Sequence, residues 1–181
     1  MIINKKKGIT MKTLLDIQIA SKHEIKELQN KDDYVLVSLT LMAIHATRVL
    51  AYLSSVRFSV IKANKPKITN RLIEEMATIL DLLFMFANEC NHDLPPLDEV
   101  FNYENNCPAE IQVDSVLIVM HMITCIAGLT HTIYAETDGF IWEQEVFSDG
   151  FNALILGLMA CIALLGNRHG FTFDELFELI G

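Results

Sequence analysis

Apolar residues along this chain recur at the spacing of helix faces, and no stretch alternates apolar and polar residues between hairpin turns. The pattern therefore predicts an all-α protein. The helices it predicts are 11–29, 34–61, about 70–89, 109–134, about 150–166 and 173–180.

Cap residues and chain breakers set the expected boundaries. Lys65-Pro66-Lys67 is expected to break the chain, and residues 91–108, with three prolines, are typical of a connector with one turn near 97–101. Gly166 to Gly170 is expected to end the helix before the last one. The expected N-caps are Asp32-Asp33, Thr69 or Asn70, Ser148 or Asp149, and Thr172.

The two halves of the chain repeat each other at an offset of 76 residues, without a gap. The run 98–101 (Asp-Glu-Val-Phe) meets 174–177 (Asp-Glu-Leu-Phe), and His45 meets His121. Residues 35–101 are expected to superpose on 111–177. The core positions expected to be equivalent are Ile79/Ile155 and Leu80/Leu156.

This repeat predicts the architecture. Each unit would be a helical hairpin with a short helical tail, too small to cover its own apolar side, so two units should pack as one bundle, a single-chain pseudo-dimer. The expected division is an N-terminal arm at 1–33, a first unit at 34–108 and a second at 109–181, within one compact domain. Segment 109–134 is apolar nearly all round and is expected to lie centrally.

The run 73–83 (IEEMATILDLL), followed by Ala-Asn-Glu at 87–89 and by 98–101, resembles the second conserved helix of the MazG-like all-α NTP pyrophosphohydrolases. Residues 151–177 resemble the same helix again. The resemblance implies hydrolysis of nucleoside triphosphates to monophosphate and pyrophosphate, through an ExxE pair on one helix and an ExxD pair on the next. Two such helices face to face present four carboxylates to Mg²⁺.

This chain departs from the family pattern at those positions. In the first unit, ExxE is replaced by His45-xx-Arg48 and ExxD by Glu75-xx-Thr78. A hard cation needs several anionic oxygens, and each unit keeps one or two, so we expect the fold to be shared more readily than the activity. The corresponding pairs in the second unit are His121-xx-Thr124 and Phe151-xx-Leu154, or Asp149-xx-Asn152 in a shifted register.

Two groups of residues are candidates for a site. The acidic group would serve catalysis and bind Mg²⁺, with Glu74 and Glu75 as the metal ligands. Alternatively, these residues are an acidic first helix turn and one exposed aspartate. The polar group would line a remodelled ligand pocket, or it forms a polar seam along the helices. The acidic candidates are Glu74, Glu75, Asp81 and Asp149, and the polar candidates are His45, Arg48, Tyr52, His121 and Thr124.

The loops that join the paired helices carry opposite charges. The first loop is basic and would bind phosphates or an acidic protein partner. Alternatively, its charges are solvated, or they form contacts within a dimer. The basic residues around the first loop are Arg57, Lys62, Lys65, Lys67 and Arg71, and the acidic residues around the second are Glu136, Asp138, Glu143 and Glu145.

Composition narrows the range of partners. A net charge of −9 argues against general nucleic-acid binding. Four cysteines without a CxxC pair are typical of reduced thiols in a cytoplasmic protein. Residues 115–135 and 151–166 lack Asp, Glu, Lys and Arg, but we expect buried helices rather than membrane spans, because the second is too short and neither has flanking cations.

Together these observations predict a non-catalytic MazG-like protein that binds a nucleotide, another phosphorylated ligand or a protein partner. Two alternatives stay open: a divergent Mg²⁺-dependent NTP pyrophosphohydrolase, and a structural or inhibitory interaction module. Homodimerisation is open as well. No cofactor is expected apart from Mg²⁺ in the enzymatic alternative.

Overall fold

The computed structural model describes residues 31–58, 65–107, 109–112, 114–137 and 144–180. Side chains are described in these ranges except at 31–34, 56–58, 65–69, 106, 110, 134–137 and 144–149. The helix expected at 11–29 lies outside the described residues. Every described element is a helix, which confirms the all-α prediction. The helices are α2 (Lys31–Phe58), α3 (Lys65–Glu89), α4 (Leu97–Asn106), α5 (Ala109–Gln112), α6 (Ser115–Thr137), α7 (Gln144–His169) and α8 (Phe173–Ile180).

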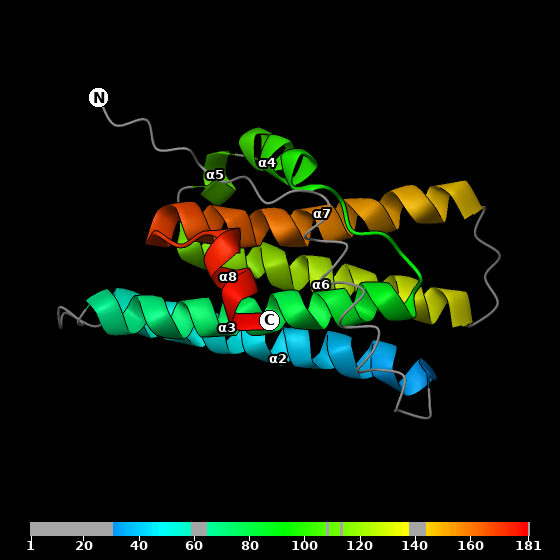
Figure 1. Ribbon diagram of the computed structural model, residues 1–181, viewed down its shortest axis with the longest axis horizontal. Coiled ribbons are helices and arrows are strands. Elements are labelled where there is room, and N and C mark those ends of the chain that lie inside the picture. The colour runs from blue at the N-terminus through cyan, green and yellow to red at the C-terminus, as the bar shows by residue number, and fades with distance from the viewer. Residues whose placement is uncertain (1–30, 59–64, 108, 113, 138–143, 181) are drawn as a thin grey trace.

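The long helices α2, α3, α6 and α7 run along the length of the molecule (Figure 1). Helix α2 packs on α3, and α6 packs on α7, so each pair forms a hairpin. The two hairpins meet mainly where α2 packs on α6. The described part of the chain is therefore a helical bundle with an α2–α6 seam between its halves.

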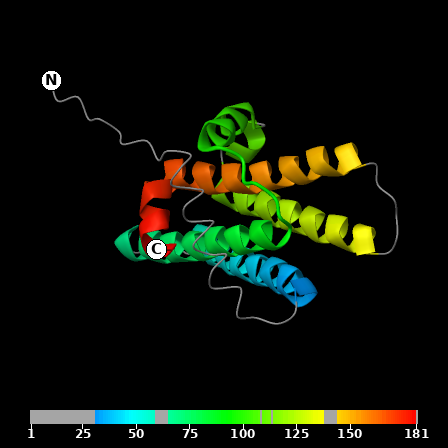
Figure 2. The same cartoon turned by 45° about the vertical axis from the view of Figure 1, so that its right-hand side comes forward.

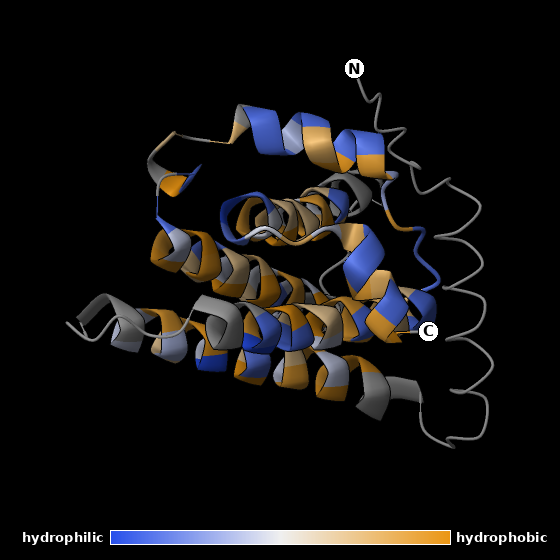
Figure 3. Cartoon of the chain, turned by 60° about the vertical axis from the view of Figure 1, so that its left-hand side comes forward, coloured by the Kyte–Doolittle hydropathy of each residue, from blue (hydrophilic) through white to orange (hydrophobic). Residues whose placement is uncertain are grey.

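The short helices are exchanged between the hairpins. Helix α4 follows α3 in the chain but packs on α7, and α8 follows α7 but packs on α3 (Figures 1 and 2). This reciprocal packing is what an approximate two-fold axis between two units would produce. Figure 3 shows blue and orange segments alternating along α4 and α8, as expected for helices that bury one side. Descent from a duplicated unit stays a prediction.

The core positions expected to be equivalent are buried to different extents. Ile79 and Ile155 are both fully buried. Leu80 is fully buried as well, whereas Leu156 is only partly buried against the core. The Phe84 and Phe177 rings lie 5.9 Å apart and attach α8 to α3.

Three helices begin earlier than predicted. Helix α3 already includes Lys65, so Thr69 and Asn70 lie inside it, because a proline is tolerated in the first turn, where its missing N–H is not needed. Helix α7 already includes Gln144, so Ser148 and Asp149 lie inside it and do not cap it. The predicted Asp32-Asp33 cap likewise falls within α2.

The central connector is more helical than predicted. The single turn expected near 97–101 is the ten-residue helix α4. The helix expected at 109–134 is divided, because Asp114 begins a new one. Its Oδ1 accepts a hydrogen bond from the Val116 N–H at 2.8 Å, and its carbonyl accepts one from the Ile118 N–H. Asp114 is thus the N-cap of α6.

The junction between α7 and α8 forms as predicted. Gly170 has a φ of 83°, and the Phe171 N–H donates to the Gly166 carbonyl at 3.1 Å, which closes the end of α7. The Thr172 N–H donates to Glu175 Oε2 at 2.8 Å, and the Glu175 N–H donates to Thr172 Oγ1 at 3.3 Å. This is a capping box, so the predicted Thr172 cap is confirmed.

Three described helices are long and apolar enough to cross a membrane by length and composition: Val35–Ser55, Ser115–Ile133 and Gly150–His169. The prediction that the third segment is too short is wrong, because α7 extends beyond 151–166 on both sides. Only 28% of the first window and 33% of the second are buried, against 67% of the third. Segment 115–133 therefore has one exposed side, so the prediction that it lies at the centre of the bundle is wrong.

The turn at the end of α7 leads to a stability prediction. A Cβ at position 166 would lie 2.6 Å from the Phe171 carbonyl oxygen, a backbone atom, so Gly166→Ala should lower the free energy of unfolding by about 1–3 kcal/mol. Gly150→Ala is the matched control on the same helix. No described atom lies within 4 Å of its Cβ position, and the higher helix propensity of alanine should stabilise the protein by up to about 1 kcal/mol. Urea unfolding followed by circular dichroism measures both, and equal effects of the two changes would contradict this account.

Candidate functional site

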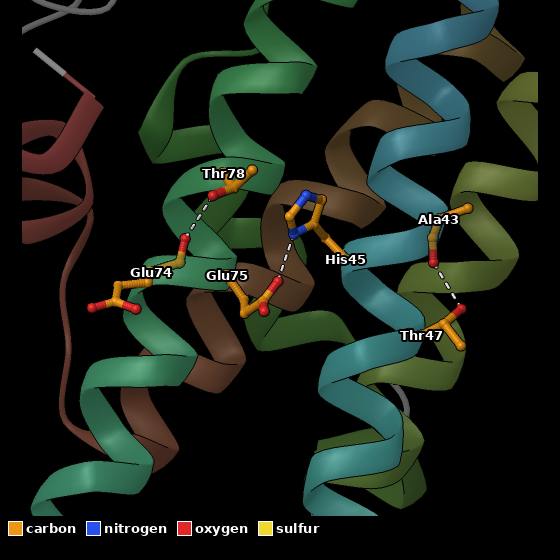
Figure 4. Close-up of polar contacts among 6 residues, drawn as sticks. All are labelled: Ala43, His45, Thr47, Glu74, Glu75 and Thr78. Atoms are coloured by element: carbon orange, nitrogen blue, oxygen red, sulfur yellow. Dashed lines mark hydrogen bonds and ion pairs between the residues drawn. The ribbon is translucent and has the colours of Figure 1, made fainter.

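The structure brings two predicted site residues together between α2 and α3. His45 Nδ1 lies 2.5 Å from Glu75 Oε2, and the side chains are only 19% and 16% exposed (Figure 4). The pair is an ion pair when the imidazole is protonated and a hydrogen bond otherwise. In the MazG-like pattern these positions would hold two metal-binding carboxylates. Here the one remaining carboxylate is bonded to an imidazole.

The other acidic candidates lie away from this pair. Glu74 points to the opposite side of α3 (Figure 4). Glu74 and Asp81 line a groove of about 290 Å³ together with Leu179 and Ile180 of α8. Neighbouring residues on a helix point about 100° apart, which explains why Glu74 and Glu75 serve different surfaces. The predicted acidic group is therefore divided. The side chain of Asp149 lies outside the described residues.

Among the polar candidates, Arg48 and Thr124 are exposed on α2 and α6. The Thr124 hydroxyl donates to the Met120 carbonyl at 3.0 Å, one turn back in its own helix. Tyr52 is half-buried, and the guanidinium of Arg71 lies over its ring, 5.1 Å from the centroid. The described contacts of Tyr52 and Thr124 are thus with Arg71 and Met120, not with the His45–Glu75 pair.

The structure describes the side chain of one of the five cations around the basic loop. Arg71 is exposed and lies against Tyr52. The side chains of Arg57, Lys62, Lys65 and Lys67 lie outside the described residues, as do those of Glu136, Asp138, Glu143 and Glu145. The predicted charge contrast between the two loops stays a prediction.

In the second unit, His121 lies in a different environment. A Cβ built on Gly157 of α7 would lie 3.1 Å from Cys125 Sγ, 3.8 Å from the Tyr103 hydroxyl and 4.0 Å from His121 Nε2. Glycine at this position thus leaves room for the three groups against α7. Phe151 occupies the place that corresponds to Glu75, and its ring stacks on Phe86 at 5.5 Å. Among the described side chains of the second unit there is therefore no counterpart of the His45–Glu75 pair.

The thiols of Cys107, Cys125 and Cys161 near Gly157 are buried. Burial raises the pKa of the Cys125 thiol to about 11, and the neighbouring Cys107 thiol adds to the shift. Burial first, and then the thiols of Cys125 and Cys107, raise the pKa of Cys161 well above its usual value. The pKa of Tyr103 is also raised, chiefly by burial. Thiols held neutral in this way are poor nucleophiles.

Sequence reasoning missed Tyr103 and Cys107 because it ended the helical turn of the connector near residue 101. Helix α4 continues to Asn106 and brings both side chains to the group around Gly157. A polar anchor holds α4 on α7: the Asn167 amide donates to the buried Glu104 carboxylate. Burial raises the pKa of Glu104, and this hydrogen bond partly offsets the rise. The helical period of Val100, Tyr103 and Glu104 was the available signal.

A bound metal ion usually has three or more protein ligands. Among the described residues, no group of three or more His, Cys, Asp or Glu side chains is placed to hold one. This agrees with the division of the acidic candidates between two sides of α3. The described part of the chain thus offers a His–Glu pair, an acidic groove and a neutral thiol cluster.

Comparisons with protein-family models, with curated proteins and with solved structures found no match to this chain. The resemblance to the MazG-like proteins therefore stays a prediction that depends on the residues quoted above. The partners and the cellular location stay predictions as well.

The His45–Glu75 contact leads to a prediction about coupling. Because the pair is mostly buried, His45→Ala and Glu75→Ala should each destabilise the protein, and the double variant should lose less than the sum of the two. We expect a coupling free energy of about 1 kcal/mol from urea unfolding of all four proteins. The control cycle pairs His45→Ala with Glu74→Ala, whose carboxylate points away. Additive effects in both cycles would show that the contact contributes nothing.

The buried thiols lead to a prediction about reactivity. With a pKa of about 11, Cys125 is thiolate in only about one molecule in a thousand at pH 8. In the folded protein, iodoacetamide at pH 8 should therefore modify Cys90, which is half-buried, long before Cys107, Cys125 or Cys161. All four should react in urea. Mass spectrometry of peptides locates the label, and early labelling of Cys125 in the folded protein would contradict the described packing.

Proposed function

We propose that this protein is a non-catalytic MazG-like protein that acts by binding a partner. The observation that carries the proposal is the His45–Glu75 contact. It lies where the family pattern would place metal-binding carboxylates on two facing helices, and the acid that remains there is bonded to an imidazole.

The surrounding residues support the same proposal. Mg²⁺ binding through protein groups depends on anionic oxygens, and Arg48 places a cation one helical turn from His45. Glu74 and Asp81 lie on the α8 side of α3, away from the pair. In the second unit, Phe151 replaces the acid altogether, and His121 lies among neutral groups. Each unit thus falls short of the carboxylates that the hydrolytic mechanism needs.

Of the two kinds of ligand, a protein partner has the better support. The groove beside α8 is lined by Glu74 and Asp81, whose charges would repel a phosphate. The exposed large apolar residues lie mainly on α2 and α6, which suits a protein surface. Nucleotide binding depends instead on the basic loop at 57–71, and it is the second candidate on the strength of that charge cluster.

The proposal predicts that no pyrophosphate is released from dUTP or the standard NTPs at ordinary enzymatic rates with Mg²⁺ present. A coupled pyrophosphate assay on the purified protein measures this. Turnover that is lost on Glu75→Gln would overturn the proposal and favour the divergent enzyme.

A gain of metal binding provides the matched test. The triple change His45→Glu, Arg48→Glu and Thr78→Asp, with Glu75 retained, would restore four carboxylates to the two facing helices. We expect this variant to bind Mg²⁺ at least tenfold more tightly than the parent by isothermal titration calorimetry. Equal affinities would show that α2 and α3 do not face each other as a metal site requires.

A further inference from the structure

The exposed apolar side chains of the described residues gather on two neighbouring helices. Val37, Leu41 and Ile44 of α2 are 49%, 37% and 41% exposed, and Leu117 and Met120 of α6 are 40% and 51% exposed. On α2 they follow the spacing i, i+4, i+7, so they form one stripe along the helix. Helix α2 packs on α6, and the reciprocal packing of α4 on α7 and α8 on α3 is that of an approximate two-fold axis between the hairpins. Such an axis turns the corresponding sides of α2 and α6 the same way, so we treat the two stripes as one surface, which we call the α2/α6 surface.

Threonine hydroxyls on these helices are turned inward. Thr40, Thr47 and Thr124 are exposed, and each donates its hydroxyl to the carbonyl four residues back in its own helix, at 2.7, 2.7 and 3.0 Å. A hydroxyl bonded in this way has its hydrogen satisfied within its own helix. These threonines therefore interrupt the apolar surface less than unbonded hydroxyls would.

The α2/α6 surface also lacks charge. Within Val35–Ser55 and Ser115–Ile133, Arg48 is the one residue among Asp, Glu, Lys and Arg. The whole chain has a net charge of −9, so most other surfaces would repel a second copy. A contact between identical surfaces must be self-complementary, and an uncharged apolar surface meets that condition without matched ion pairs.

The surface repeats at the offset of 76 residues. Leu41 corresponds to Leu117, and Ile44 corresponds to Met120, and all four are exposed. Such a surface has its own approximate two-fold relation, so two copies can pack helix against helix in a closed pair.

The surface is also large enough for a specific contact. The stripe from Val37 to Ser55 is about 27 Å long at 1.5 Å per residue, and two helices about 9 Å apart give a width of about 18 Å. The product is about 500 Å² for each copy and about 1,000 Å² for a pair, which is near the smallest area expected of a biological interface and suits a weak dimer.

We infer that the α2/α6 surface is the interface of a homodimer. The inference names a second copy of the chain as the partner that the proposed function leaves open. It rests on the proposed function only in assuming that the protein acts by binding. A lipid bilayer fits less well. Because α3 packs on α2 in the same bundle, insertion of the bundle would bury Arg71, Glu74 and Asp81 of α3.

Sedimentation equilibrium of the full chain tests the inference. We expect a mass near 41 kDa, twice the 20.5 kDa of one chain, at micromolar concentration. The double variant Ile44→Glu and Met120→Glu should raise the dissociation constant at least about tenfold, because it places four carboxylates in the dimer interface. Leu179→Glu is the matched control: Leu179 is 57% exposed but lies on α8, so this change should leave the dimer intact.

A crosslinking measurement tests the interface if the double variant fails to fold. Ile44→Cys should crosslink two copies through a short bis-maleimide, whereas Leu179→Cys and the parent should not. A full chain that is monomeric throughout, a folded double variant that stays dimeric, or a monomer that pellets with neutral phospholipid vesicles would each overturn the inference. A dimer that also releases pyrophosphate would instead overturn the proposed function and leave the dimer standing.

Discussion

The fold depends on the exchange of short helices between the two hairpins. Neither α3 nor α7 is covered by the tail that follows it in the chain, because α4 packs on α7 and α8 packs on α3. Aromatic contacts such as Phe84–Phe177 fasten one tail, and the Glu104–Asn167 hydrogen bond fastens the other. Removal of either tail would expose the apolar side of the opposite hairpin, so each half depends on the other to cover its core.

The same exchange decides the chemistry of the candidate sites. With α8 on one side of α3 and α2 on another, the adjacent residues Glu74 and Glu75 enter different environments. One lines the acidic groove, and the other is bonded to His45. In the second unit, α4 delivers Tyr103 to the place where His121 points, and burial there favours neutral groups. Two units with a common helical pattern thus hold different chemistry.

The exchange also determines which surface is left for a partner. The short helices cover α3 and α7, while the outer sides of α2 and α6 keep exposed apolar residues. In a molecule with a net charge of −9, this surface is nearly free of charge, and its threonines are satisfied within their own helices. The exposure of this apolar surface therefore follows from how the bundle is closed, independently of the candidate sites on α3.

The sequence by itself determined the all-α class, the stop at Gly170 and the cap at Thr172. These depend on residue identity or on neighbours within four positions, which a sequence displays directly. It misplaced the starts of α3 and α7, the break at Asp114 and the burial of α6. Only the tertiary structure decided which side of α3 each acid faces and which helix each tail covers, because those outcomes depend on packing between residues far apart in the chain.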